Sequence, residues 1–141
     1  MCNIGDIIVV NKYKGDDGKI LNRHSFIVLN DEAGTIEGCS YDLVCNVMSS
    51  FKSEEHKSKK LRHQENMGVT KDDLNVTGND SDGYIKADKL YFFLEKDLDY
   101  KVIGNINQDV LSRLFELIKL LQEKGLLVNV TVNIWIEDES A

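Results

Sequence analysis

Short apolar runs rich in β-branched residues recur along this chain, and only one segment has the spacing of an amphipathic helix. The runs cover residues 4–10, 25–30, 41–48, 84–93 and 100–103, and turn-forming residues follow most of them. Residues 128–136 alternate apolar and polar side chains, which is the pattern of a half-buried strand. These segments predict a mainly β fold of the α+β class.

The one helical segment follows Asn107, a suitable N-cap, and stops at Gly125. Its apolar face must pack on the sheet and consists of Val110, Leu111, Leu114, Phe115, Ile118 and Leu121. Residues 52–83 contain few large apolar side chains, so they are predicted to form mostly surface loop with at most one edge strand.

The length of 141 residues, with 42% hydrophobic side chains, suits one domain spanning residues 1–141. No stretch approaches the roughly 20 apolar residues that cross a bilayer, and the first residues do not resemble a signal peptide. The three cysteines, Cys2, Cys39 and Cys45, are not arranged as a secreted disulfide scaffold. We therefore expect a cytoplasmic protein with no membrane segment.

The net charge of −7 argues against a nucleic-acid binder that works by bulk electrostatics. The charge is uneven, because residues 1–67 contain nine Lys/Arg and ten Asp/Glu whereas residues 68–141 contain eight and fourteen. Any site for a polyanion is therefore expected in the first half.

Metal and cofactor motifs do not stand out. Cys39 and Cys45, like His56 and His63, lack the spacing of zinc ligands. There is no phosphate-binding Gly-rich loop and no Gly-x-Ser-x-Gly nucleophile motif. No metal or cofactor is predicted.

Several strings, in order, resemble the PemK/MazF family of toxin-antitoxin ribonucleases. They are Gly5-Asp6-Ile7-Ile8, Arg23-His24-Ser25-Phe26-Ile27-Val28, Val44-Cys45-Asn46-Val47-Met48-Ser49-Ser50, Ala87-Asp88-Lys89-Leu90-Tyr91-Phe92 and Ile103-Gly104-Asn105-Ile106. The resemblance covers residues 3–125 and implies an SH3-like β-barrel with one C-terminal amphipathic helix. Residues 126–141 would add a terminal strand that closes the barrel, covers an edge or makes an interface.

The resemblance implies a homodimeric endoribonuclease toxin that acts on single-stranded RNA and is neutralised by an antitoxin protein. Such enzymes need no metal, because the 2′-hydroxyl of the RNA attacks the neighbouring phosphate and leaves a 2′,3′-cyclic phosphate. Arg23 would hold the phosphoryl oxygens, and the hydroxyls of Ser49 or Ser50 would donate to the same phosphate. Alternatively, the two serines only terminate their strand.

His24 is a candidate general acid or base beside Arg23, or else a packed or surface histidine. The most basic segment is a second candidate RNA contact, with a solvated surface loop as the competing interpretation; it contains Lys52, His56, Lys57, Lys59, Lys60, Arg62 and His63. Some aromatic residues are candidates for base stacking or for the core: Tyr41, Phe51, Tyr91 and Phe92.

Two other functions stay open on the sequence alone. One is a non-catalytic binder on the same barrel, such as a gyrase-directed relative of these toxins, which the net charge and His24, in place of the family's usual proline, favour. The other is a structural or regulatory domain that uses residues 52–83 to recognise a partner.

Overall fold

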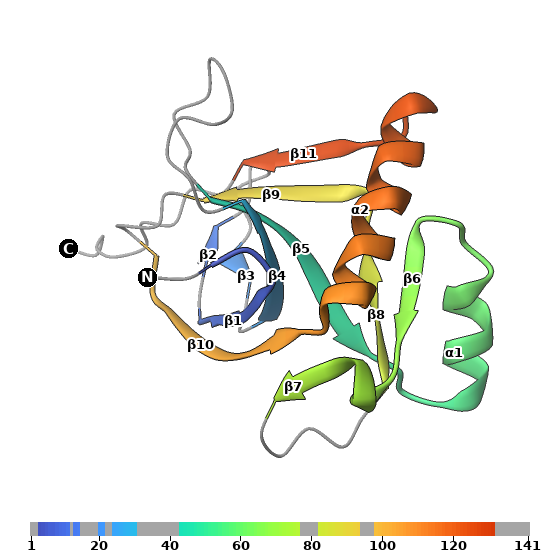
Figure 1. Ribbon diagram of the computed structural model, residues 1–141, viewed down its shortest axis with the longest axis horizontal. Coiled ribbons are helices and arrows are strands. Elements are labelled where there is room, and N and C mark those ends of the chain that lie inside the picture. Colours follow the sequence, from blue (N-terminus) through green and yellow to red (C-terminus); the bar gives the residue numbers. More distant parts are fainter. Residues whose placement is uncertain are drawn as a thin grey trace.

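A computed structural model describes residues 3–11, 13–14, 20–21, 24–30, 43–76, 82–93 and 98–131. This part of the chain is mainly β, with a curled sheet and two α-helices (Figure 1). The strands are β1 (Asp6–Val10), β2 (Tyr13–Lys14), β3 (Ile20–Leu21), β4 (His24–Asn30), β5 (Leu43–Ser50), β6 (Asn66–Val69), β7 (Leu74–Val76), β8 (Gly83–Lys86), β9 (Lys89–Phe93), β10 (Tyr100–Ile106) and β11 (Val128–Thr131). The helices are α1 (Glu54–Leu61), a 3₁₀ turn η1 (Lys71–Asp73) and α2 (Gln108–Glu123).

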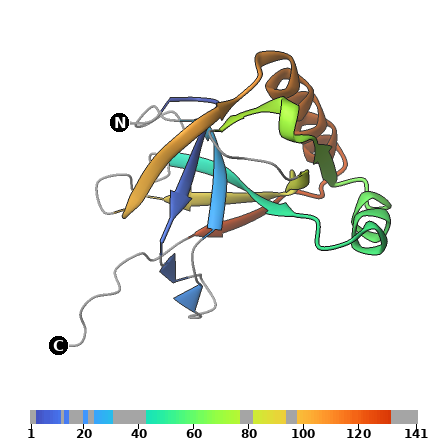
Figure 2. The same cartoon turned by 90° about the horizontal axis from the view of Figure 1, so that it is seen from below.

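The main sheet has the order β11-β9-β5-β4-β1-β10-β7, and β8 pairs with both β5 and β6. All of its pairs are antiparallel except β11 with β9. β2 and β3 form a separate two-stranded sheet. Figure 2 shows the curl of the main sheet, with α1 at one end. The prediction of a mainly β fold is therefore confirmed.

Both faces of the main sheet bury apolar side chains. On one face, α2 contributes Val110, Leu111, Leu114 and Leu121 to a cluster with strand residues such as Ile27 and Ile85. On the other face, Phe26 packs edge-on against Tyr91 and Phe93 with centroid distances of 5.2 Å to each ring. The alternating side chains of the central strands therefore feed two cores, which explains their nearly continuous apolar composition.

Helix α2 begins and ends where the sequence predicts. Asn107 is its N-cap residue, although its side chain makes no capping bond. Gly125 has φ +71°, and the amides of Gly125 and Leu126 donate to the carbonyls of Gln122 and Leu121, which is a Schellman motif. Phe115 was expected on the packed face but is 39% exposed.

The prediction of one helix and of a loop over residues 52–83 was wrong. This segment holds α1, β6, η1, β7 and the first residue of β8. α1 buries no side chain, so it lacks the apolar spacing that identified α2. Ser53 caps it by accepting the His56 amide at 3.0 Å, and Glu54, Glu55, Lys59 and Lys60 complement the helix dipole.

Residues 84–93 form two successive strands, β8 and β9, which both pair with β5, rather than one continuous strand. Met48 is opposite Ile85 and Cys45 is opposite Tyr91, so the segment between β8 and β9 bulges away from β5. The Asn46 amide holds this bulge by donating to the carbonyls of Lys89 at 2.8 Å and Ala87 at 3.5 Å. Asn46 is fully buried, and its Oδ1 atom has no hydrogen-bond partner in the described part of the chain.

Two further strand predictions are refined. β10 does not stop before Gly104 but continues to Ile106, because Gly104 and Asn105 pair with both β1 and β7. β11 covers the outer edge of β9, which is one of the three roles expected for the terminal strand. Residues 132–136 of that expected strand lie outside the described residues.

Candidate functional site

An open groove lies where β4 begins and β5 ends. Its lining includes Val9 of β1 and Ile103 of β10. The other lining residues are His24, Ser25, Met48, Ser49, Ser50 and Lys52. It continues into a smaller pocket of about 110 Å³ whose lining includes Ile7, Val69 and Gly83. We call the larger depression the β4–β5 groove. It brings four predicted site residues together: His24, Ser49, Ser50 and Lys52.

Strand alternation separates the two predicted hydroxyls. Ser25 is opposite Met48 in the sheet, and Ser50 lies two residues beyond Met48 on the same face. Ser49 is opposite Tyr84 and belongs to the other face of the strand. Ser50 and Ser25 are therefore the pair of hydroxyls on one face of the strands. Ser49 and Ser50 are also the last two residues of β5, as the interpretation of strand termination expected. Sequence reasoning missed Ser25, because only the strand register places it beside Met48.

Arg23, the first predicted catalytic residue, lies outside the described residues. Its expected convergence with Ser49 or Ser50 on a phosphate stays a prediction. The next residue, His24, opens β4 opposite Val10 and is partly buried at the groove.

Part of the predicted basic segment is helix rather than loop: α1 holds His56, Lys57, Lys59 and Lys60, whereas Lys52, Arg62 and His63 flank it. His56, Lys57 and Lys60 are half-buried, and each lies near an aromatic ring. The remaining basic residues of the segment are exposed: Lys52, Lys59, Arg62 and His63.

The half-buried basic residues surround two aromatic rings at the end of β5. Phe51 stacks on Tyr84 with a centroid distance of 5.3 Å and an interplanar angle of 26°. The Lys57 ammonium lies 5.8 Å from the Phe51 centroid, and that of Lys60 lies 5.9 Å from the Tyr84 centroid. His56 meets both rings edge-on, at 6.3 Å and 6.0 Å. Part of the basic character of α1 therefore has a packing role.

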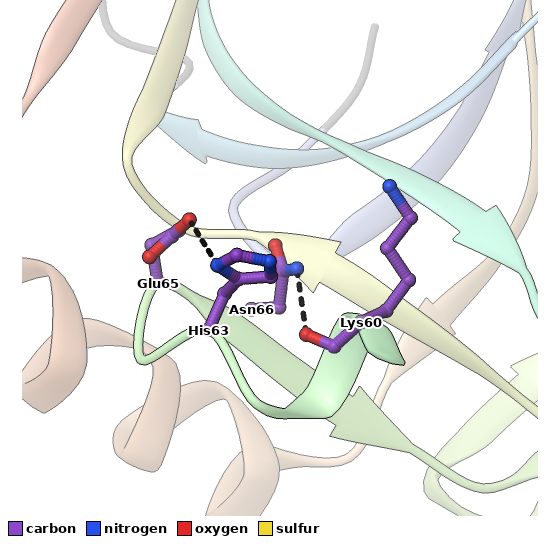
Figure 3. Close-up of polar contacts among 4 residues, drawn as sticks. All are labelled: Lys60, His63, Glu65 and Asn66. Carbon is purple, nitrogen blue, oxygen red and sulfur yellow. Dashed lines mark hydrogen bonds and ion pairs between the residues drawn. The ribbon is translucent and has the colours of Figure 1, made fainter. Parts of the chain in front are cut away.

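The far end of α1 is held by contacts that do not involve the groove. Figure 3 shows the Asn66 amide donating to the Lys60 carbonyl at 2.9 Å, and His63 Nδ1 lying 3.8 Å from a carboxylate oxygen of Glu65. His63 does not line the β4–β5 groove, and its contact with Glu65 is exposed and weak.

His56 connects α1 to the groove. Its Nδ1 atom accepts the backbone amide of Lys52 at 3.1 Å, so the neutral ring with its proton on Nε2 fits this bond. Burial lowers the pKa of His56, and the nearby positive charges of Lys60, Lys52 and Lys59 lower it further.

Acidification is therefore expected to destabilise the protein through His56. The folded-state pKa lies below the unfolded value of 6.5, so the unfolded chain binds the proton first as the pH falls. The contribution is present above this value and is lost progressively below it. Urea unfolding of wild type and His56→Gln at pH 7.5 and 5.5 should show a smaller pH dependence in the variant.

His63→Gln is the matched control for this measurement, because the same change is made at an exposed position that bonds no backbone amide of the groove. An equal pH dependence in wild type and His56→Gln would contradict the assignment.

In comparisons with known proteins, no family model, no curated protein and no solved structure matches the chain. In the ranges that the structure describes, no helix is long and apolar enough to cross a bilayer. Nor do the same residues include three His, Cys, Asp or Glu side chains grouped as metal ligands.

Proposed function

We propose that this chain is a PemK/MazF-like toxin on an SH3-like barrel, and that it cleaves single-stranded RNA without a metal. The observation that carries the proposal is the β4–β5 groove. Strand pairing joins His24 to a hydroxyl-rich segment, Ser49 and Ser50, and to Lys52, although these residues are far apart in the sequence. The first half of the chain, where a polyanion site was expected, supplies all of them.

The chemistry needs groups that place and polarise a phosphodiester. The RNA 2′-oxygen attacks phosphorus and gives up its proton, the bond from phosphorus to the 5′-oxygen breaks, and the 5′-oxygen takes a proton. Water is the proposed carrier of both protons, because strand alternation places His24 on the face opposite to Ser25 and Ser50. The Ser50 and Ser25 hydroxyls and the Lys52 ammonium stabilise the charge on the phosphoryl oxygens, with the Arg23 guanidinium as the expected principal donor.

The setting follows from the same proposal. The protein acts as a cytoplasmic homodimer, and an antitoxin protein neutralises it by occupying the RNA groove.

A non-catalytic binder is the second candidate, and two observations favour it. Lys57 and Lys60 already lie on aromatic rings, and the net charge of −7 opposes RNA binding at long range. Such a protein would use the groove to hold a partner, for instance gyrase.

The decisive experiment incubates the protein with a long single-stranded RNA in EDTA and compares it with Arg23→Ala. Cleavage that leaves cyclic-phosphate ends and disappears in the variant supports the nuclease. Intact RNA together with an effect on gyrase supercoiling supports the binder.

Ser50→Ala is expected to lower the cleavage rate about a hundredfold, since it removes one hydrogen-bond donor from the transition state. The measurement is the single-turnover rate on a labelled RNA. Ser112→Ala, the same change on the exposed side of α2, should leave the rate unchanged. A full rate in Ser50→Ala would remove this hydroxyl from the mechanism.

A further inference from the structure

We propose that a pocket beside the groove is a nucleobase subsite that prefers guanine, an inference that rests on the proposed binding of RNA. The pocket has a volume of about 270 Å³ and is lined by Phe51, Lys52, Ser53, Glu54, Lys57 and Asp82. We call it the Phe51 pocket. Lys52 lines both this pocket and the β4–β5 groove, so a base here would belong to a nucleotide next to the phosphate in the groove.

Phe51 supplies the surface for stacking. Its ring is half-buried and is held from behind by its contact with Tyr84, which is itself only 4% exposed. A ring fixed in this way loses little entropy when a base stacks on it. The Lys57 ammonium lies over the ring, 5.8 Å from its centroid, so a stacked base requires this long side chain to move to a phosphate or to a base edge.

Asp82 supplies a fixed acceptor. One of its carboxylate oxygens, Oδ1, accepts the Lys71 amide at 2.9 Å, and its carbonyl accepts the Phe51 amide at 3.3 Å. No other partner of the carboxylate occurs among the described residues, so Oδ2 has none there, and Asp82 lines the pocket. Glu54 adds a second carboxylate at the same pocket.

This combination of groups matches guanine better than the other bases. Guanine presents two adjacent donors, N1–H and N2–H, that a carboxylate accepts, and its O6 and N7 atoms accept from lysine. Adenine offers only its N6 amino group, and uracil only its N3–H. Carboxylates also repel RNA phosphates, so their presence is explained by contact with a base edge rather than with the backbone.

Local structure explains only part of the pocket. Glu54 complements the N-terminus of α1 and Ser53 caps it, so these two residues have a role without any ligand. Neither role accounts for the open pocket that Phe51 and Asp82 line together.

The test measures binding of 2′-O-methyl octamers, which lack the attacking hydroxyl, by fluorescence anisotropy at fixed salt. The octamers are octauridine and octauridine with guanine, inosine or adenine at the third and sixth positions. Wild type should bind the guanine octamer about tenfold tighter than the adenine octamer, with inosine between them because it lacks the 2-amino group. Phe51→Leu should weaken all four about tenfold.

Three charge variants locate the preference. Asp82→Asn keeps an oxygen for the Lys71 amide but replaces one carboxylate oxygen, an acceptor, by an amide donor. Glu54→Gln makes the same exchange of acceptor for donor in the first turn of α1. Each variant should reduce the preference for the guanine octamer over the adenine octamer to less than about threefold, because it removes one of the two acceptor groups. Glu55→Gln changes the charge equally but does not line the pocket, so it should keep the full preference.

The outcomes separate the subsite from the proposed function. Equal affinity of wild type for the guanine and adenine octamers, or a full guanine preference in both Asp82→Asn and Glu54→Gln, overturns the subsite and leaves RNA binding standing. Failure to bind any octamer overturns both.

Discussion

Replacing Asn46 by aspartate is expected to lower the free energy of unfolding by about 3–5 kcal/mol at pH 7. Asn46 is fully buried, and its amide donates to two carbonyl oxygens of the bulge between β8 and β9. The aspartate removes the donor and places a negative charge beside those carbonyls, and the contacts of Asn46 among the described residues include no cation. A loss of this size is a large share of the roughly 5–15 kcal/mol that stabilises a typical domain.

The loss in Asn46→Asp should depend on pH. Burial raises the folded-state pKa of the new carboxyl above the unfolded value of about 3.9. The penalty is therefore complete above the folded pKa, shrinks as the pH falls below it, and is smallest below the unfolded pKa, where the protonated acid can donate one of the two bonds that the amide made. Urea unfolding of wild type and variant at several pH values measures this difference.

Asn46→Ala is the control, because it also removes the donor but adds no charge. Its cost should be about 1–3 kcal/mol and should not vary with pH. An equal, pH-independent loss in the two variants would show that the aspartate carries no buried charge and would contradict this prediction.

Gly83→Ala is expected to cost about 3 kcal/mol or more, the upper range for inserting a methyl group where there is no room. A Cβ atom at Gly83 would lie 2.3 Å from the Ser49 carbonyl oxygen, which is a backbone atom of the neighbouring strand. β8 would have to move away from β5 at the end of the groove, where Gly83 is opposite Ser50. Stability should therefore fall, and with it the proposed RNA cleavage.

Gly68→Ala provides the matched comparison on β6, the other neighbour of β8. Its Cβ atom would meet the end of the Leu61 side chain at 3.2 Å, and this side chain can rotate away. Its cost should stay below about 1 kcal/mol. Thermal and urea unfolding of both variants test the contrast, and equal losses would refute the steric explanation.

Local patterns in the sequence were sufficient for elements that bury a periodic apolar face. β1, β4 and β5 contain runs of β-branched residues, and α2 has both an apolar stripe and a glycine stop. α1 was missed because it buries no side chain. Its signals were capping and charge: Ser53 precedes two glutamates, and two lysines occupy the last turn.

The site was less predictable because it depends on register. That His24, Ser49 and Ser50 share a groove follows from the pairing of β4 with β5, which the resemblance suggested but no local pattern specifies. Ser25 and Asp82 were missed for the same reason, since each meets the site only through a partner strand. The Asn46 bulge likewise needs the offset between β8 and β9, which neither segment encodes alone.

The parallel pairing of β11 with β9 has a consequence for synthesis on the ribosome. β11 follows α2, so the outer edge of β9 and the Asp88 carbonyl, which accepts the Val128 amide at 2.7 Å, receive their partner only when this late segment has emerged. Until then the nascent chain presents an open strand edge that can pair with a neighbouring nascent chain. Only residues 124–127 separate α2 from β11, so docking of the helix brings the protecting strand into place with little delay.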